Sequence, residues 1–317
     1  MIPNALNGPV RDASLVTLSL LAWNLGVMSS DANPTGGTVA QGGATFNTSG
    51  SQFTINSTAV NTVINWQSFN IGVGETTTFV EPTATSVVWN HINDANPSQI
   101  LGNINANGYV VLQNQNGIVV GGNAAIKAAG LVMTTSPTPA PNLSSGGAWE
   151  FDAPPPASQI INYGQITTAG GPAYLIANQI ENYGTISAQR GQIGLYAGQQ
   201  VLLSTSPTGL GLSAKVTLPQ GSVDNEGKLI ADGGTIQALA QTVNQNGTVQ
   251  ANTVQNVNGV IELVASDNLT IGPNSDIEAN GDSSANNPSP GGFVVLQAGT
   301  SYSDTTSSMI NVAGANG

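Results

Sequence analysis

The sequence predicts an all-β protein, a parallel β-helix in which coils of about 20 residues stack into a solenoid. Composition is the first indication: 39 of the 317 residues are glycine, and only 7% are charged. Lys, Glu and Arg are too scarce for ordinary helical surfaces, whereas the abundant Val, Ile and Thr favour strands and Asn and Gly favour turns. No segment has helical periodicity, and short turn motifs recur at a constant spacing.

The recurring turns are the strongest indication. Asn162-Tyr163-Gly164 recurs as Asn182-Tyr183-Gly184, and the same step of 20 residues separates Gly227 from Gly247. Short segments of alternating apolar and polar residues follow these turns, which predicts strands with one buried face. Asn162 and Asn182 would occupy equivalent turns, so we expect their side chains to stack in a ladder.

A single coil of this kind cannot be stable alone. Ordering its backbone costs roughly 1–2 kcal/mol per residue. Burying each of its few apolar side chains returns only about 1.5–3 kcal/mol. The coils must therefore stack and share both their hydrogen bonds and their core.

Residues 1–32 are expected to be a signal peptide or an N-terminal extension. Arg11 precedes a mainly apolar stretch, residues 15–27, and small residues follow up to Ala32, after which cleavage would occur. The alternative is an ordinary capping strand.

The remaining chain divides into three parts. Residues 33–135 are expected to form an N-terminal cap and the first coils, with Trp66 and Phe69 packed under the cap. Residues 136–158 are rich in proline, which cannot serve interior ladder positions, and predict an extra-helical loop. Residues 159–317 are expected to form repeat coils, with a second loop near 280–290 and a last coil that is only beginning.

Charge and cysteine content exclude several functions. The net charge is −12, and the five basic residues are scattered, so no patch can neutralise a run of phosphates and no nucleic-acid partner is expected. The chain has no cysteine, which excludes disulfides and thiolate metal sites. We expect no cofactor.

An ordered set of motifs in residues 33–135 points to a family. The motifs are Asn33-Pro34-Thr35-Gly36-Gly37, Ile64-Asn65-Trp66-Gln67-Ser68-Phe69-Asn70-Ile71-Gly72, Asn96-Pro97-Ser98-Gln99-Ile100-Leu101-Gly102, Asn107-Gly108-Tyr109-Val110-Val111-Leu112 and Asn114-Gln115-Asn116-Gly117-Ile118. This set resembles the haemagglutination-activity, or two-partner secretion, domain of filamentous-haemagglutinin-type exoproteins. The later Asn-x-Gly coils look like the repeats of that family.

The resemblance implies a capped, right-handed β-helix and a secreted or cell-surface location in a Gram-negative-type bacterium. It also implies that the periplasmic domains of a dedicated outer-membrane barrel recognise the unfolded chain. The family's Asn-Pro-Asn-Gly motif appears here as Asn114-Gln115-Asn116-Gly117, without its proline. The recognition candidates are therefore Asn114, Gln115, Asn116, Gly117 and Ile118, together with Asn96 and Pro97. The first five would also form a tight turn.

Trp149 and Phe151 flank the proline-rich segment and form a candidate contact loop. They would either pin that segment to the solenoid or present an exposed contact surface.

Enzymatic chemistry is not expected. His91 is the only histidine, so no Ser-His-Asp set exists without it, and Asp94 is the acid nearest to it in sequence. Asp224, Glu226 and Asp232 are expected to be solvated turn acids, with an incidental calcium site as the alternative.

Three functions remain open at this point. The first is an exported exoprotein that acts in adhesion, with a host or neighbouring cell surface as partner. The second is an extracellular filament subunit whose β-helices stack end to end on one another. The third, a polysaccharide-acting β-helix enzyme, is disfavoured because the acids are dispersed.

Overall fold

The computed structural model describes residues 33–315 except 142, 144–147, 153, 155–157, 206–211, 256 and 284–288. The expected signal peptide, residues 1–32, lies outside the described residues. Among the described residues no helix is long and apolar enough to cross a membrane.

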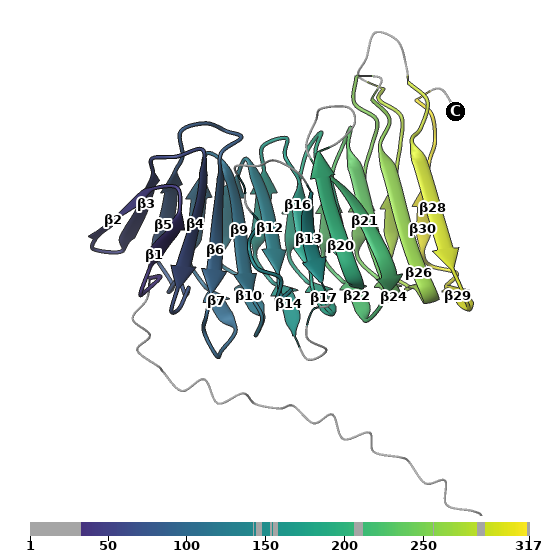
Figure 1. Ribbon diagram of the computed structural model, residues 1–317. Coiled ribbons are helices and arrows are strands. Elements are labelled where there is room, and N and C mark those ends of the chain that lie inside the picture. Colours follow the sequence, from purple (N-terminus) through teal and green to yellow (C-terminus); the bar gives the residue numbers. More distant parts are fainter. Residues whose placement is uncertain are drawn as a thin grey trace, which may run out of the picture. The chain divides into compact units, whose positions relative to one another are not determined.

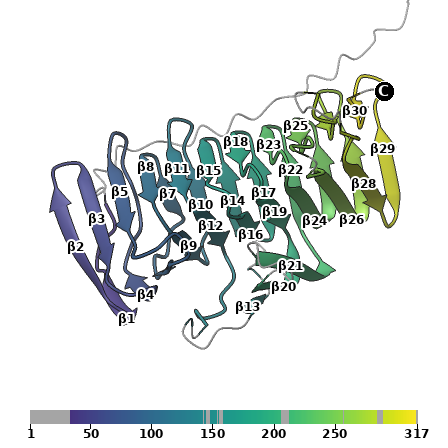
Figure 2. The same ribbon diagram turned by 90° about the horizontal axis from the view of Figure 1, so that it is seen from above.

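The described chain winds into a parallel β-helix with three faces (Figure 1, Figure 2). From residue 87 onward each coil contributes a strand segment to each face, and each segment pairs in parallel with the segment one coil away. The expected fold class is confirmed.

The strands of each face follow the chain from coil to coil. The first face contains β4 (Asn61–Trp66), β6 (Val87–Ile92), β9 (Tyr109–Asn114), β12 (Gly130–Thr134), β16 (Ala173–Ile176), β19 (Gln192–Tyr196), the first parts of β24 (Thr235–Gln245) and β26 (Val260–Ile271), and β28 (Phe293–Ala298). The second contains β7 (Ser98–Ile100), β10 (Ile118–Val120), β14 (Gln159–Asn162), β17 (Gln179–Asn182), β22 (Ser222–Asn225), the last parts of β24 and β26, and β29 (Ser301–Asp304). The third contains β3 (Gln52–Ser57), β5 (Thr76–Val80), β8 (Asn103–Ala106), β11 (Ala125–Ala128), β15 (Gln165–Thr168), β18 (Thr185–Ser187), β23 (Lys228–Ile230), β25 (Thr248–Gln250), β27 (Asp276–Glu278) and β30 (Met309–Asn311).

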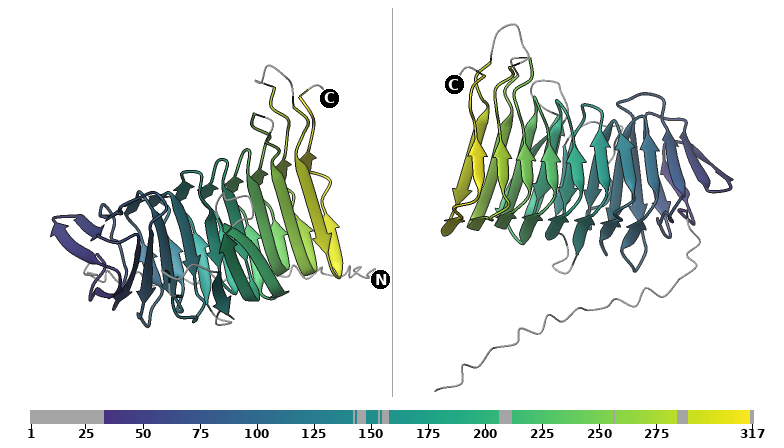
Figure 3. Two further views of the ribbon diagram at one scale, coloured as in Figure 1. Left: turned by 45° about the horizontal axis from the view of Figure 1, so that its top comes forward. Right: turned by 180° about the vertical axis from the view of Figure 1, so that it is seen from behind.

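The register reproduces the repeat seen in the sequence. Asn162 pairs with Asn182 in the next coil, a step of 20 residues. The following step takes Asn182 to Asn225, because an insertion lengthens that coil. Register is maintained across the insertion because the inserted strands lie outside the solenoid (Figure 3), and Gln220 N–H donates to Ala197 O at 2.9 Å where the chain leaves and returns.

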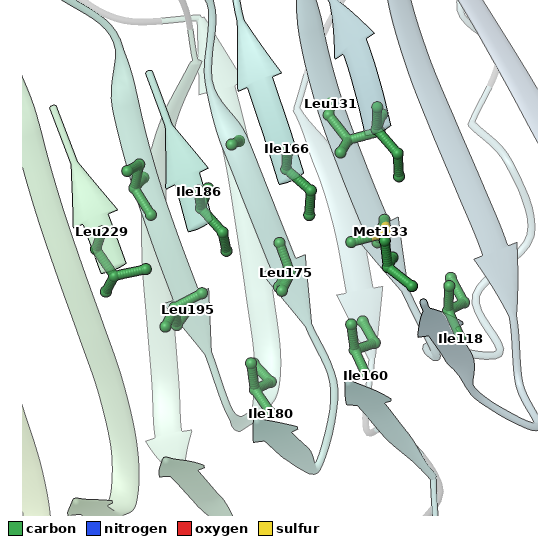
Figure 4. Packing of buried hydrophobic residues seen from close by; sticks show 14 of the residues in the cluster. Ile118, Leu131, Met133, Ile160, Ile166, Leu175, Ile180, Ile186, Leu195 and Leu229 are labelled. Carbon is green, nitrogen blue, oxygen red and sulfur yellow. The ribbon is translucent and has the colours of Figure 1, made fainter. Parts of the chain in front are cut away.

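The interior is a continuous column of aliphatic side chains. Leu175, Ile180 and Ile186 come from the three faces of one coil and point into the same buried space (Figure 4). The column extends from Phe53 to Ala279, so one core serves all the intervening coils.

The N-terminal end of the solenoid is closed by antiparallel strands. β1 (Thr38–Gln41) pairs with β4, and β2 (Ala44–Ser49) pairs with β3. Beneath them, Trp66 contacts the rings of Phe46, Phe53 and Phe69 at centroid distances of 5.2–6.0 Å. The Trp66 indole N–H donates to Asn90 Oδ1 at 2.9 Å, so the ring is fixed in a dry interior. Trp66 and Phe69 thus pack under the cap, as the sequence predicts.

A small extra-helical sheet covers the outer side of the first face. It consists of β13 (Trp149–Asp152), β20 (Gly198–Thr205) and β21 (Leu212–Pro219), all antiparallel (Figure 2). Phe151, Val201 and Leu203 of this sheet are buried against outward-facing residues of the first face, including Trp89 and Tyr174. The sequence does not predict the β20–β21 hairpin.

Candidate functional site

The recognition candidates lie in two neighbouring turns, which we call the recognition turns: Asn96–Pro97 before β7, and Asn114–Ile118 between β9 and β10. Ser98 N–H donates to Gly117 O at 3.0 Å, and Asn114 Nδ2 donates to Asn96 O at 3.1 Å. The two candidate stretches, separated in sequence, are therefore adjacent in the fold.

Three of the candidates are buried. Asn114 has no exposed surface, and its Oδ1 accepts a hydrogen bond from Asn116 N–H at 2.9 Å. Gly117 has a φ of 113°, a left-handed conformation that favours glycine, and its N–H donates to Asn114 O. Ile118 belongs to the core. In the folded domain these three residues form the turn.

The exposed part of the recognition turns is uncharged. Gln115, Asn116 and Asn96 are exposed, and Pro97 is half-buried. Asn116 Nδ2 donates to Asp94 O at 2.6 Å, which holds one turn against the other. The surface can offer amide donors and acceptors in a fixed geometry, but no acid–base group of its own.

Trp149 and Phe151 pack on the solenoid. Phe151 is fully buried and stacks on Trp89, while Trp149 is half-buried and meets the edge of the same ring at 5.5 Å. The Trp89 indole N–H donates to Gln113 Oε1 at 2.7 Å. These contacts hold β13 against the first face.

The acid and histidine candidates do not converge. His91 Nδ1 lies 3.1 Å from Gln113 Oε1. Asp224, Glu226 and Asp232 each accept a hydrogen bond from an amide side chain one coil away, namely Asn244, Asn246 and Gln250. Within the described ranges no three His, Asp or Glu residues could jointly hold a metal ion.

The predicted asparagine ladder is present and extends further than expected. Asn162 Nδ2 donates to Asn182 Oδ1 at 2.8 Å, and Asn182 Nδ2 donates to Asn225 Oδ1 at 2.7 Å. Asn225 Nδ2 then donates to Gln245 Oε1 at 2.8 Å. All four side chains are buried, so the ladder satisfies polar groups that would otherwise be costly inside the solenoid.

Glu81 is a feature that the sequence does not single out. Its carboxylate is buried, with Oε2 accepting from the backbone N–H groups of Asn107 and Gly108 at 3.2 and 3.1 Å. Asn107 Nδ2 donates to the Glu81 carbonyl at 2.7 Å, which ties this coil to the next. Burial raises the pKa of Glu81 to about 7 despite these bonds. An isolated Glu between strands gives no local signal of burial.

The described chain is a parallel β-helix with three faces, a cap at its N-terminal end and an extra-helical sheet on one side. Secretion domains use a capped β-helix of this kind. The family model of the TPS secretion domain, the domain of two-partner secretion, matches residues 30–303, and the chain belongs to this family.

Relatives and solved structures agree with this assignment. The heme/hemopexin-binding protein of Haemophilus influenzae is 30% identical over 280 residues, covering 84% of this chain and 31% of the relative. A second Haemophilus influenzae protein of that name is 29% identical, covering 68% of this chain and 26% of the relative. The crystal structure of the HMW1 secretion domain from Haemophilus influenzae matches with a TM-score of 0.76 and 25% identity, covering 89% of this chain and 84% of that one. The chain spans about a third or less of the length of the curated relatives it matches.

Proposed function

We propose that this secretion domain is recognised by a cognate outer-membrane barrel and leads its exoprotein out of the cell through that barrel. Family membership carries the proposal: the chain matches the TPS secretion domain over residues 30–303. The periplasmic domains of the barrel would bind the chain before it folds, and the folded solenoid would form outside.

The geometry of the recognition turns supports binding before folding. Asn114 and Ile118 are fully buried in the folded domain, and Gly117 is also buried. A partner can contact these side chains only in an unfolded chain. Folding then hides them in the solenoid, which would release the barrel and oppose return of the chain.

The cap supports folding in one direction. Strands β1 and β2 cover the N-terminal edge, so later coils can add only at the opposite edge. Each added coil gains hydrogen bonds and core contacts from the coil before it. Emergence of the capped end first would allow folding outside to favour outward transport.

Binding to the purified periplasmic domains of the barrel tests this proposal. A variant kept unfolded by a core charge, Ile166→Asp, should bind, and the folded chain should bind at least about tenfold more weakly. In the unfolded variant, adding Gln115→Ala and Asn116→Ala should weaken binding. A matched pair in the cap hairpin, Asn47→Ala and Gln52→Ala, should leave it unchanged. Equal binding of the folded and unfolded chains would overturn the proposal.

We propose adhesion as the role of the complete exoprotein, with a host or neighbouring cell surface as the partner. Both curated relatives are named heme/hemopexin-binding protein, a name that states the binding of a partner molecule. Retention of the labelled, purified protein on cells tests this role, and retention no greater than that of an unrelated protein of similar charge would contradict it.

A filament subunit is the second candidate. The last described coil exposes apolar side chains at the edge opposite the cap; they are Phe293, Val295, Tyr302, Met309, Ile310 and Val312. Another solenoid could cover this edge end to end, as could a further coil of the same chain. Electron microscopy of the purified chain distinguishes these two ways of covering the edge. Fibres would support end-to-end stacking of solenoids, and single short particles would oppose it.

We also propose that the domain is not itself an enzyme. Its histidine is bonded to Gln113 and its turn acids to neighbouring amides, which leaves no nucleophile–base pair among them. Turnover of polysaccharides by the purified chain, lost on replacing Asp224 or Glu226, would contradict this.

A further inference from the structure

A column of outward-facing side chains runs along the corner between the second and third faces. Backbone hydrogen bonds between successive coils fix its order: Tyr163, Tyr183, Glu226 and Asn246 occupy the same position in four consecutive coils. The first two are aromatic and the last two are polar. Asn246 Nδ2 donates to Glu226 Oε2 at 2.7 Å, so the polar half of the column is also ordered.

The two tyrosines form a rigid, half-exposed platform. Their rings are nearly parallel, with centroids 5.1 Å apart and planes inclined by 9°. Tyr163 is 47% exposed and Tyr183 46% exposed. The position before Tyr163 in the column is Gly121, and the side chain of Leu101 from the coil before it lies over this glycine, because a Cβ on Gly121 would be 2.8 Å from Leu101 Cδ2.

A groove of about 420 Å³ runs beside this column. Its floor is formed by glycines that follow the column residues directly; they are Gly164, Gly184, Gly227 and Gly247. The floor cannot carry side chains: a Cβ on Gly184 would lie 2.1 Å from Gly164 O. Across the floor stand Gln165, Thr185, Lys228 and Thr248, so both walls offer hydrogen-bonding groups.

The charges at the groove favour a neutral ligand. Tyr183 Oη donates to Glu181 Oε2 at 3.0 Å, and Glu226 lines the groove. Lys228 is the only basic residue among those that line it. Partial burial and the bond to Glu181 raise the pKa of Tyr183 to about 12, so its hydroxyl stays neutral at physiological pH. An anionic polymer would meet carboxylates here on a chain of net charge −12.

We propose that this groove binds a neutral glycan chain along the solenoid axis, with a sugar ring against the exposed parts of the Tyr163 and Tyr183 side chains and sugar hydroxyls on the Glu226–Asn246 pair. A pyranose presents an apolar C–H face and a rim of hydroxyls, and the column presents exposed aromatic surface followed by a carboxylate acceptor and an amide. Coils repeat every 4.8 Å or so, which places the aromatic and polar halves within reach of one short oligosaccharide. The solenoid holds these groups in place before binding, which lowers the entropy cost of association.

Glycan binding would add a class of ligand to the proposed role in adhesion, and it rests on that role. Its test does not depend on export of the chain. The full 317-residue chain, refolded from denaturant, is applied to an array of neutral gluco-, galacto-, manno- and N-acetylglucosamine oligosaccharides with heparin and polygalacturonate as acidic comparisons. The dissociation constant of the best neutral binder is then measured by calorimetry. Binding should survive added salt, because no ion pair is involved.

Variants assign the binding to the column. Tyr163→Ala and Tyr183→Ala should each weaken binding by about threefold to tenfold. Tyr163→Phe should bind within about twofold of the original chain, because it keeps the ring. Tyr302→Ala removes another exposed tyrosine, 48% accessible, and should leave binding unchanged. Unchanged thermal unfolding of the alanine variants separates loss of contact from loss of fold.

Three results would overturn the inference. They are no binding to any neutral glycan on the array, binding of acidic glycans alone, and binding that the double variant Tyr163→Ala/Tyr183→Ala leaves intact. Failure of the chain to leave the cell would not bear on it, because the binding is measured on refolded protein.

Discussion

The rings of Trp89 and Phe151 lie parallel, with centroids 5.7 Å apart and planes inclined by 10°, although one belongs to the solenoid and the other to the extra-helical sheet. Trp89 faces outward from β6, where a large aromatic ring would otherwise be exposed. Phe151 covers it from β13, and both residues are fully buried. The extra-helical sheet is therefore a second hydrophobic layer on the first face.

Replacing Phe151 by alanine should destabilise the domain by about 3–5 kcal/mol, because it opens a cavity over Trp89. The free energy of unfolding in urea measures the effect. Phe293→Ala is the matched control: that ring is 59% exposed, so its loss should cost well under about 1 kcal/mol. Equal effects of the two substitutions would show that the sheet is only loosely attached.

Asn182→Ala should break the buried ladder at its centre. Asn162 Nδ2 would lose its acceptor and Asn225 Oδ1 its donor, and each stranded group costs about 1–3 kcal/mol. Asn47→Ala, in an exposed position of β2, should change stability by less than about 0.5 kcal/mol. Chemical denaturation of both variants checks this, and a small effect of Asn182→Ala would mean that water replaces the ladder.

Gly184→Ala should be more damaging than Gly122→Ala. A Cβ at Gly184 would lie 2.1 Å from Gly164 O in the preceding coil, whereas one at Gly122 meets no atom within 4 Å. Separating two coils should cost at least about 1–3 kcal/mol. Thermal unfolding of both variants measures the difference. Equal melting temperatures would contradict the close stacking of Gly184 on Gly164 in the preceding coil.

Glu81 should make the stability of the domain depend on pH. Its pKa is raised from 4.5 to about 7 by burial, so the folded state holds its proton more tightly than the unfolded chain does. The stabilisation that this tighter proton binding gives the folded state is fully present below pH 4.5 and is lost as the pH rises through about 7. Its full size is at most about 3 kcal/mol. The difference in unfolding free energy between the wild-type chain and Glu81→Gln should shift between these pH values, and a constant difference would rule out a titrating Glu81.

Sequence patterns predict the parts of this fold that repeat. The step of 20 residues between Asn162 and Asn182 is enough to anticipate both the coil and the side-chain ladder. Proline content predicts that residues 136–158 leave the solenoid, and Trp149–Asp152 of this stretch form β13 of the extra-helical sheet. The β20–β21 hairpin escapes prediction because its alternating strands have the same pattern as coil strands, and alternation does not distinguish parallel from antiparallel pairing.

The surface features depend on which coils become neighbours. Tyr163 and Tyr183 stand out in the sequence as a repeat, but their ring stacking follows from the register. Glu226 joins their column only because an insertion separates it from Tyr183 without shifting that register. The burial of Glu81 likewise depends on Asn107 and Gly108, which lie a coil further on.

Export through the partner barrel tests whether this domain needs a cognate outer-membrane barrel to leave the cell. The chain is expressed in a Gram-negative host with and without its cognate barrel, and the folded domain in the medium is quantified by its resistance to protease. We expect folded domain outside the cell only when the barrel is present, and a reduced amount when Gln115 and Asn116 are both replaced by alanine. Equal amounts in the medium with and without the barrel would contradict this expectation.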